Sequence, residues 1–180
     1  GQIKDSATYK EYAWVNDNSG IAIKDSTVVM KSYTGYKFKS LSHDVKAGDK
    51  VANGTVIVFE YEKDDSQTKT LSYTVIHRIN GHDLDVKVIS ETVWINAQDK
   101  ITVTEESIAK KNYVGYKFSS ITPSVEAGDK VDNGTNIVIE YVKDESQQKD
   151  VFYTVKHETA GTLRESHEFS NKVWINDESL

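Results

Sequence analysis

The stretch Tyr73-Thr-Val-Ile-His-Arg-Ile-Asn-Gly81 decides how this chain folds. Its side chains alternate with a period of two, with Tyr73, Val75 and His77 on one face, and this period predicts a β-strand. Asn80-Gly81 then favours a two-residue hairpin turn, because both residues adopt positive φ readily. The segment therefore predicts a strand that turns back into a second, longer strand over residues 83–95.

The same strand returns 80 residues later with Tyr153, Val155 and His157 on the corresponding face. On the other face Ile76 is replaced by Lys156. A position that exchanges an apolar for a charged side chain faces water, so we expect the Tyr/Val face to point inward.

Repetition with this period extends over the whole sequence without a gap. Tyr33-Thr-Gly-Tyr-Lys-Phe38 returns as Tyr113-Val-Gly-Tyr-Lys-Phe118, and the segment 47–55 returns as 127–135. Three tryptophans also share one register, Trp14, Trp94 and Trp174. A long, fixed period is typical of an array in which each repeat is one folding unit.

The composition excludes several classes of protein. The 180 residues are 37% hydrophobic with one proline, which is typical of a folded chain. A net charge of −6 without a basic patch argues against nucleic acid as a partner. The lack of cysteine excludes disulfides and cysteine-based zinc sites. No apolar run is long enough for a membrane span and no signal peptide or anchor is visible, so we expect no membrane insertion here and targeting signals, if any, outside this sequence.

Most of the repeat is predicted to be extended, so the expected fold is mostly β, of the α+β kind. Residues 104–111 are the one stretch with helical composition, and Thr104 is the expected N-cap. Asp132-Asn-Gly-Thr135 predicts a second hairpin turn, followed by a strand over residues 136–142. Two polar, charged segments, 63–69 and 143–150, have the composition of linkers.

These linkers place the module boundaries. We predict a first module over 1–66 that lacks its opening strand, a complete second module over 70–146, and the first hairpin of a third module over 150–180. The alternative phase, with boundaries at the tryptophan-containing turns, gives modules 21–100 and 101–180.

The order of motifs within a repeat resembles the mucin-binding-protein (MucBP) family, the β-grasp repeats of Gram-positive cell-surface proteins. The residues that carry the resemblance are Tyr73-Thr-Val with Asn80-Gly81, Tyr113 with Gly115-Tyr116, and Asn133-Gly134-Thr135 running to Tyr141-Val142. The tandem also looks like the repeat regions of cell-wall-anchored proteins of gut Firmicutes. The resemblance implies β-grasp-like modules, each a mixed sheet with at most one short helix, an extracellular location, and adhesion to mucin or another host glycoprotein.

The repeated tryptophans are the candidate ligand-binding residues. Trp14, Trp94 and Trp174 offer either one sugar-stacking platform per module or a core residue beside each junction. Because Val93 and Ile95 share a face opposite Trp94, both faces of this strand must be partly covered. Packing of the tryptophan against the helical or Gly-Tyr segment is the interpretation that we favour.

Nothing in the sequence predicts catalysis, a cofactor or a metal site. His77 and His157 recur, but no His-x-His or Glu-x-x-His pattern accompanies them. The segment 129–140 has the outline of a calcium loop, yet Val131 stands where a side-chain ligand is required. Lys117, Asn133 and Glu140 are the residue types of an intramolecular isopeptide cross-link, although a turn explains Asn133 fully.

The sequence therefore predicts a non-enzymatic tandem repeat of a bacterial cell-surface adhesin, anchored to the cell wall through a region outside this sequence. Its expected partners are host mucin or glycoprotein glycans and the neighbouring repeats. The alternative is a stalk that binds nothing and projects a distal domain from the cell wall.

Overall fold

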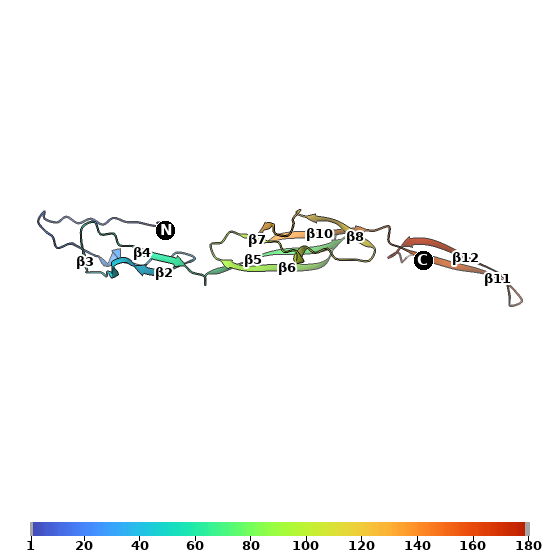
Figure 1. Ribbon diagram of the computed structural model, residues 1–180. Helices are drawn as coiled ribbons and strands as arrows, with labels where there is room; N and C mark the ends of the chain where they lie inside the picture. Colours follow the sequence, from blue (N-terminus) through green and yellow to red (C-terminus); the bar gives the residue numbers. More distant parts are fainter. Residues whose placement is uncertain (1, 179–180) are drawn as a thin grey trace. The chain divides into compact units, whose positions relative to one another are not determined.

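The computed structural model describes residues 2–178 (Figure 1). The chain forms two compact units. Unit 1 consists of Gly1–Lys69 with Trp94–Ala97, and unit 2 consists of Thr70–Val93 with Gln98–Leu180. Each is described separately below.

A four-stranded sheet forms the body of unit 2. Its first two strands, β5 (Thr68–Ile79) and β6 (His82–Trp94), are joined by the predicted turn. Asn80 and Gly81 have φ of 50° and 80° there, as a tight hairpin turn requires. The hairpin prediction is confirmed.

The sheet is completed by β8 (Tyr116–Thr122) and β10 (Thr135–Lys143), in the order β6-β5-β10-β8. β10 is antiparallel to β8 but parallel to β5, with Ile137 opposite Val75. The first and last strands are thus the central parallel pair of a mixed sheet, which is a β-grasp arrangement. The predicted fold class, mostly β with a mixed sheet, is confirmed.

The crossover between the two halves of the sheet contains almost no helix. It consists of β7 (Lys100–Thr102), a 3-10 turn η3 (Glu106–Ile108) and β9 (Lys130–Asp132), and β7 pairs with β9. The predicted helix over 104–111 is wrong beyond this single turn. Ser107 hydrogen-bonds the carbonyl of Thr104 with both its amide and its hydroxyl group, and Ala109 is already extended.

The second predicted hairpin is also wrong, although the turn itself exists. β9 and β10 flank Asn133-Gly134 but do not pair with each other. The side-chain oxygen of Asn133 accepts a hydrogen bond of 2.8 Å from the amide of Ser72, and the amide of Gly134 donates one of 2.7 Å to the Ser72 carbonyl. The turn therefore attaches the start of β10 to β5.

The core of unit 2 lies on one face of this sheet. Alternate residues of β5 are buried, with Tyr73 fully inaccessible, as the sequence predicts. The buried cluster contains Leu71, Tyr73, Val75, Ile79, Ile101, Val103, Val131, Ile137, Ile139 and Tyr141. At about 25 cal/mol per Å² of apolar area, the burial of these side chains is the main source of stability of the unit.

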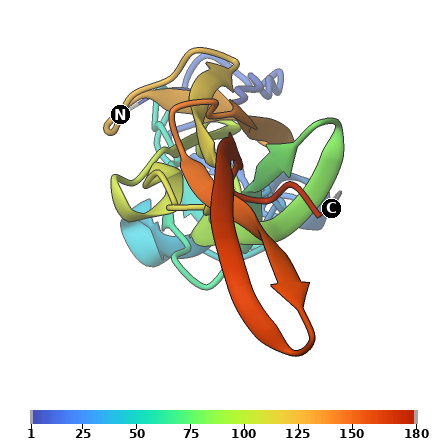
Figure 2. The same ribbon diagram turned by 90° about the vertical axis from the view of Figure 1, so that its right-hand side faces the viewer.

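Unit 2 also contains the hairpin of β11 (Gln148–Thr159) and β12 (Thr162–Trp174), coloured orange and red in Figure 2. Its turn, Ala160-Gly161, has φ of 49° and 76°. Phe152 and Tyr153 of β11 are 69% and 62% exposed. No helix among residues 2–178 has both the length and the apolar character needed to cross a membrane.

Unit 1 has the elements of the second half of the same module. β2 (Tyr36–Leu41) pairs with β4 (Phe59–Lys63), and β1 (Ile21–Ala22) pairs with β3 (Lys50–Val51). Two 3-10 turns, η1 (Asp25–Thr27) and η2 (Ser42–Asp44), lie between the strands. Ile23 is the single hydrophobic residue that is fully buried among the described residues of this unit.

Candidate functional site

Trp174 is held by backbone groups from the turn before β8. Its indole Nε1 donates a hydrogen bond of 3.0 Å to the carbonyl of Gly115, and its ring meets the Tyr116 ring edge to face at 5.4 Å. Asn176 donates a hydrogen bond of 2.7 Å from Nδ2 to the carbonyl of Val114. The end of β12 is thereby fixed to the Gly115-Tyr116 turn.

Gln147, which precedes β11, joins these segments. Its Oε1 accepts a hydrogen bond of 2.8 Å from the amide of Gly115, and its carbonyl accepts one of 2.9 Å from the amide of Ile175. Its Nε2 donates to the side chain of Asp144 at 3.0 Å. Hydrogen bonds from Gln147 and Ser146 lower the pKa of Asp144. We call this set of contacts, formed by residues 114–116, 144–147 and 174–176, the Gly115 latch.

The latch requires glycine at position 115 for two reasons. Gly115 has a φ of 81°, in the left-handed region. A Cβ atom at this position would lie 2.4 Å from Nδ2 of Asn176 and 2.9 Å from Cζ2 of Trp174. Any larger residue must therefore displace the tryptophan or the asparagine.

Unit 1 contains a second latch of the same composition, the Gly35 latch, formed by residues 34–36, 64–67 and 94–96. Trp94 donates to the carbonyl of Gly35 at 3.1 Å, and Asn96 donates to the carbonyl of Thr34 at 2.7 Å. Gln67 accepts from the amide of Gly35 at 2.8 Å. The two latches correspond residue for residue at the repeat period.

The polar segments with linker composition are short, ordered turns in both latches. β10 ends at Lys143 and β11 begins at Gln148, so four residues connect them. The amide of Gln147 bonds the carbonyl of Asp144, and the Ser146 hydroxyl bonds the Asp144 carboxylate at 2.7 Å. The expectation of a flexible linker is replaced by a hydrogen-bonded turn.

The three candidate tryptophans have two different environments. Trp94 and Trp174 are half-buried, and the ammonium groups of Lys63 and Lys143 lie 5.4 and 5.1 Å from their ring centroids. Trp14 is 74% exposed. A sugar that stacked on either latched indole would have to displace the lysine, whereas the indole N–H is already used.

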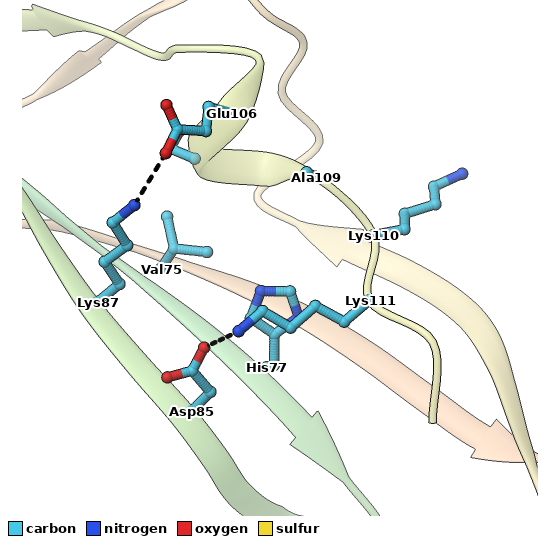
Figure 3. Close-up of a pocket in the computed structure, with 9 residues that line it drawn as sticks. Val75, His77, Asp85, Lys87, Glu106, Ala109, Lys110 and Lys111 are labelled. Carbon is cyan, nitrogen blue, oxygen red and sulfur yellow. Dashed lines mark hydrogen bonds and ion pairs between the residues drawn. The ribbon is translucent and has the colours of Figure 1, made fainter. Parts of the chain in front are cut away.

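A pocket of about 240 Å³ lies over the inner face of β5 (Figure 3). His77, 4% exposed, and Val75, 1% exposed, are its innermost side chains. Its other lining residues are Asp85, Lys87, Glu106, Ser107, Ala109, Lys110 and Lys111. The pocket combines an apolar floor with a charged rim.

The charges of the rim are largely paired. Lys111 forms an ion pair with Asp85, and Lys87 forms one of 3.4 Å with Glu106. Figure 3 shows both pairs, and shows Lys110 pointing away from them. The Lys110 ammonium group lies 3.9 Å from the centroid of a neighbouring aromatic ring, that of Phe118. The pocket therefore presents hydrogen-bonding groups without an unpaired charge.

His77 is a neutral acceptor in this arrangement. The Tyr141 hydroxyl oxygen accepts a hydrogen bond of 2.7 Å from the amide of Lys111, so its proton is available to Nδ1 of His77, 3.0 Å away. His77 then carries its own proton on Nε2. Burial, with a smaller contribution from the Lys111 charge, lowers the pKa of His77.

The other chemistry-bearing residues are dispersed. Among residues 2–178 no three histidine or carboxylate side chains converge as a metal site. Asn133 bonds Ser72, whereas Lys117 is an exposed side chain 4.0 Å from Asp144. The three residue types of an isopeptide cross-link therefore serve other contacts.

The latch residues other than tryptophan escaped the sequence analysis, although a signal was present. Asp64, Gln67 and Asn96 are identical to their counterparts one period later, in segments where most polar residues are free to differ. Identity of a glutamine in a polar linker, at the same period as a tryptophan, indicates a specific hydrogen bond. The pocket had no such signal, because Lys87 and Glu106 correspond to Ala7 and Ser26 in the preceding repeat.

Comparison of the chain with models of known protein families found no match, and a search of curated proteins found no significant relative.

Proposed function

We propose that this chain is a non-enzymatic spacer segment from the repeat region of a bacterial cell-surface protein. The observation that carries the proposal is the presence of the same latch twice, with Trp94 and Trp174 each occupied by backbone contacts. A residue that closes a junction is not available as a platform for a ligand.

The latch supports a spacer because it removes freedom at a junction. A flexible linker lets the end-to-end distance of an array grow only as the square root of its length. In the Gly115 latch a four-residue turn, the end of β12 and the Gly115-Tyr116 turn share direct hydrogen bonds. An array with such junctions keeps a reach proportional to the number of repeats.

The cell-surface setting is supported by the resemblance to MucBP repeats and by the lack of cysteine. A fold without disulfides does not depend on the redox state of its compartment. We infer anchoring to the cell wall through a region outside this sequence.

Spin-label distance measurements test the junction within unit 2. The chain has no cysteine, so the exposed Ser119 of β8 and Thr162 of β12 can be changed to cysteine and labelled without further substitution. We expect a narrow distance distribution that broadens in Gly115→Ala. Gly134→Ala is the matched control, because Gly134 has a φ of 85° and a Cβ there would meet no atom within 4 Å. An equally broad distribution without any substitution would contradict the spacer proposal.

A second candidate function, adhesion to mucin or glycoprotein glycans, is favoured by the pocket over His77. A small apolar floor with hydrogen-bonding groups at the rim suits a neutral sugar, whose hydroxyl groups can bridge paired charges. The tryptophans are unsuitable for testing it, because Trp94→Ala and Trp174→Ala would also open the latches.

A mucin and glycan binding screen should instead compare two charge-pair deletions. Lys87→Ala/Glu106→Ala removes one pair from the pocket rim, and Lys172→Ala/Asp150→Ala removes a pair from the β11–β12 hairpin. Binding that is lost only in the first variant supports adhesion through the pocket. A chain that binds no glycan at all supports the spacer alone.

A further inference from the structure

The strand β4 of unit 1 has one unpaired edge. It pairs with β2 on one side, and no other described strand pairs with it. Its counterpart β10 in unit 2 has two neighbours, β8 and the parallel strand β5. Tyr61 is consequently only half-buried, whereas Tyr141 is 1% exposed. An unpaired edge with an apolar face is a template for another strand.

The hairpin β11–β12 has the complementary deficiency. β11 pairs with β12 alone. Tyr153 is 62% exposed, whereas its counterpart Tyr73 in β5 is fully inaccessible. His157 is exposed as well, whereas His77 is buried. β4 and β11 are therefore the two strands that would form the central parallel pair of one module.

Hydrogen-bonding groups on the two sides match as well. In unit 2 the Tyr73 hydroxyl bonds Oγ of Ser107, which itself donates to the Thr104 carbonyl. In unit 1 the hydroxyl of Thr27 donates to the carbonyl of Lys24 at 2.7 Å, and its oxygen can still accept a bond from the counterpart Tyr153.

The same holds at the far end of the strands. Tyr61 accepts a hydrogen bond of 2.8 Å from the amide of Lys31, as Tyr141 does from Lys111. The Tyr61 proton is then available to a histidine in the place of His77, which is His157 in β11.

We propose that the free edge of β4 binds the β11–β12 hairpin of a second copy of this chain. The register follows from β5 and β10, where Tyr73 is opposite Thr135 and Ile79 is opposite Tyr141. Shifted by one period on each strand, it places Tyr153 of the second copy opposite Thr55, Val155 opposite Ile57, His157 opposite Phe59 and Thr159 opposite Tyr61.

One existing contact must be exchanged. Asp5 forms an ion pair with Lys31, at the place where Asp85 pairs with Lys111. The incoming β12 brings Glu165 to that position, so the charge of the partner is conserved. Because the edge and the hairpin are different surfaces of the chain, the contact is heterologous and joins copies head to tail.

Sedimentation velocity over a range of concentrations tests the proposal with matched variants. We expect concentration-dependent oligomers whose association weakens by about tenfold or more in Val155→Asp, which buries a charge in the new interface. Thr154→Asp, on the opposite face of the exposed β11 strand, should associate like the unmodified chain. A chain that stays monomeric, or that associates equally well as Val155→Asp, would overturn the proposal.

Cysteine cross-linking tests the register and the occupant. In the proposed register Val58 lies opposite Lys156 of the second copy. A mixture of Val58→Cys and Lys156→Cys chains should form a disulfide-linked dimer on mild oxidation, and a mixture of Val58→Cys and Thr162→Cys chains should not. Efficient closure within one chain that carries both Val58→Cys and Lys156→Cys, at dilutions where the mixture does not react, would identify the hairpin of the same chain as the occupant and refute the second copy.

Discussion

Gly115 shows how much of a junction can depend on the absence of one carbon atom. The residue combines a positive φ with close contacts to Trp174 and Asn176. A positive φ was foreseeable from the Gly-Tyr motif, because glycine adopts it readily. The contacts were not, because they join segments that are 59 residues apart in the sequence.

We predict that Gly115→Ala destabilises the junction more than Gly134→Ala. Both variants incur about 1–2 kcal/mol for a left-handed alanine. Gly115→Ala also displaces the indole and the Asn176 amide, which adds about 2 kcal/mol from lost packing and hydrogen bonds. Denaturant unfolding followed by tryptophan fluorescence measures the difference, and equal losses in the two variants would show that the close contacts are unimportant.

His77 gives unit 2 a dependence on pH. Its pKa lies below the ordinary value of 6.5, so the unfolded chain binds the proton more readily than the folded one. The stabilisation is complete above about pH 6.5 and is lost as the pH falls toward the lowered pKa of the folded state.

We therefore expect the unfolding free energy of unit 2 to decrease between about pH 7 and about pH 5.5, and to decrease less in His77→Gln. His157→Gln removes a histidine from the exposed face of β11 and should retain the slope of the unmodified chain. Urea midpoints measured at several pH values give the slopes. If His77→Gln retains the full slope, other groups are responsible.

At the scale of elements, sequence and structure agree where the information is local. The Asn80-Gly81 turn and the inward face of β5 follow from neighbouring residues, and both are confirmed. The predicted helix and the second hairpin fail because distant partners decide them. Ser72 captures the Asn133-Gly134 turn, and Tyr141 takes the amide of Lys111. Where one repeat ends and the next begins in the parent array stays a prediction.

The two kinds of strand pair in unit 2 should respond differently to force. β5 begins and β10 ends the sheet, and the two strands are parallel with seven paired positions. Force applied to residues 68 and 145 shears all these pairs together. In the antiparallel β11–β12 hairpin, force applied to the facing residues Asp150 and Lys172 separates the pairs one at a time.

We expect single-molecule pulling through cysteines at Thr68 and Glu145 to require a several-fold higher force than pulling through cysteines at Asp150 and Lys172. Both attachment pairs are exposed and the chain has no other cysteine. Similar forces for the two geometries would mean that the parallel pair is not the mechanically resistant element.

At the scale of the whole molecule, each latch belongs to a different unit and the two share no residue. Sites without common partners contribute independently. Gly115→Ala should therefore accelerate hydrogen exchange at the amide of Ile175, which bonds Gln147, and leave the amide of Ile95, which bonds Gln67, unchanged.

Gly35→Ala should give the reverse pattern, because a Cβ atom there would lie 2.4 Å from Nδ2 of Asn96. Amide exchange followed by mass spectrometry or NMR reports both positions in one sample. Acceleration at both amides in either variant would reveal coupling between the latches.

The identity of the two latches at a constant period also bears on how the gene can change. Each latch takes its parts from both sides of a repeat boundary, and every part recurs 80 residues later. An unequal crossover that adds or deletes 80 codons joins a glycine turn to a tryptophan from a new neighbour and still produces a correct joint. The length of such a protein can therefore vary between strains in whole repeats, without any compensating mutation at the seam.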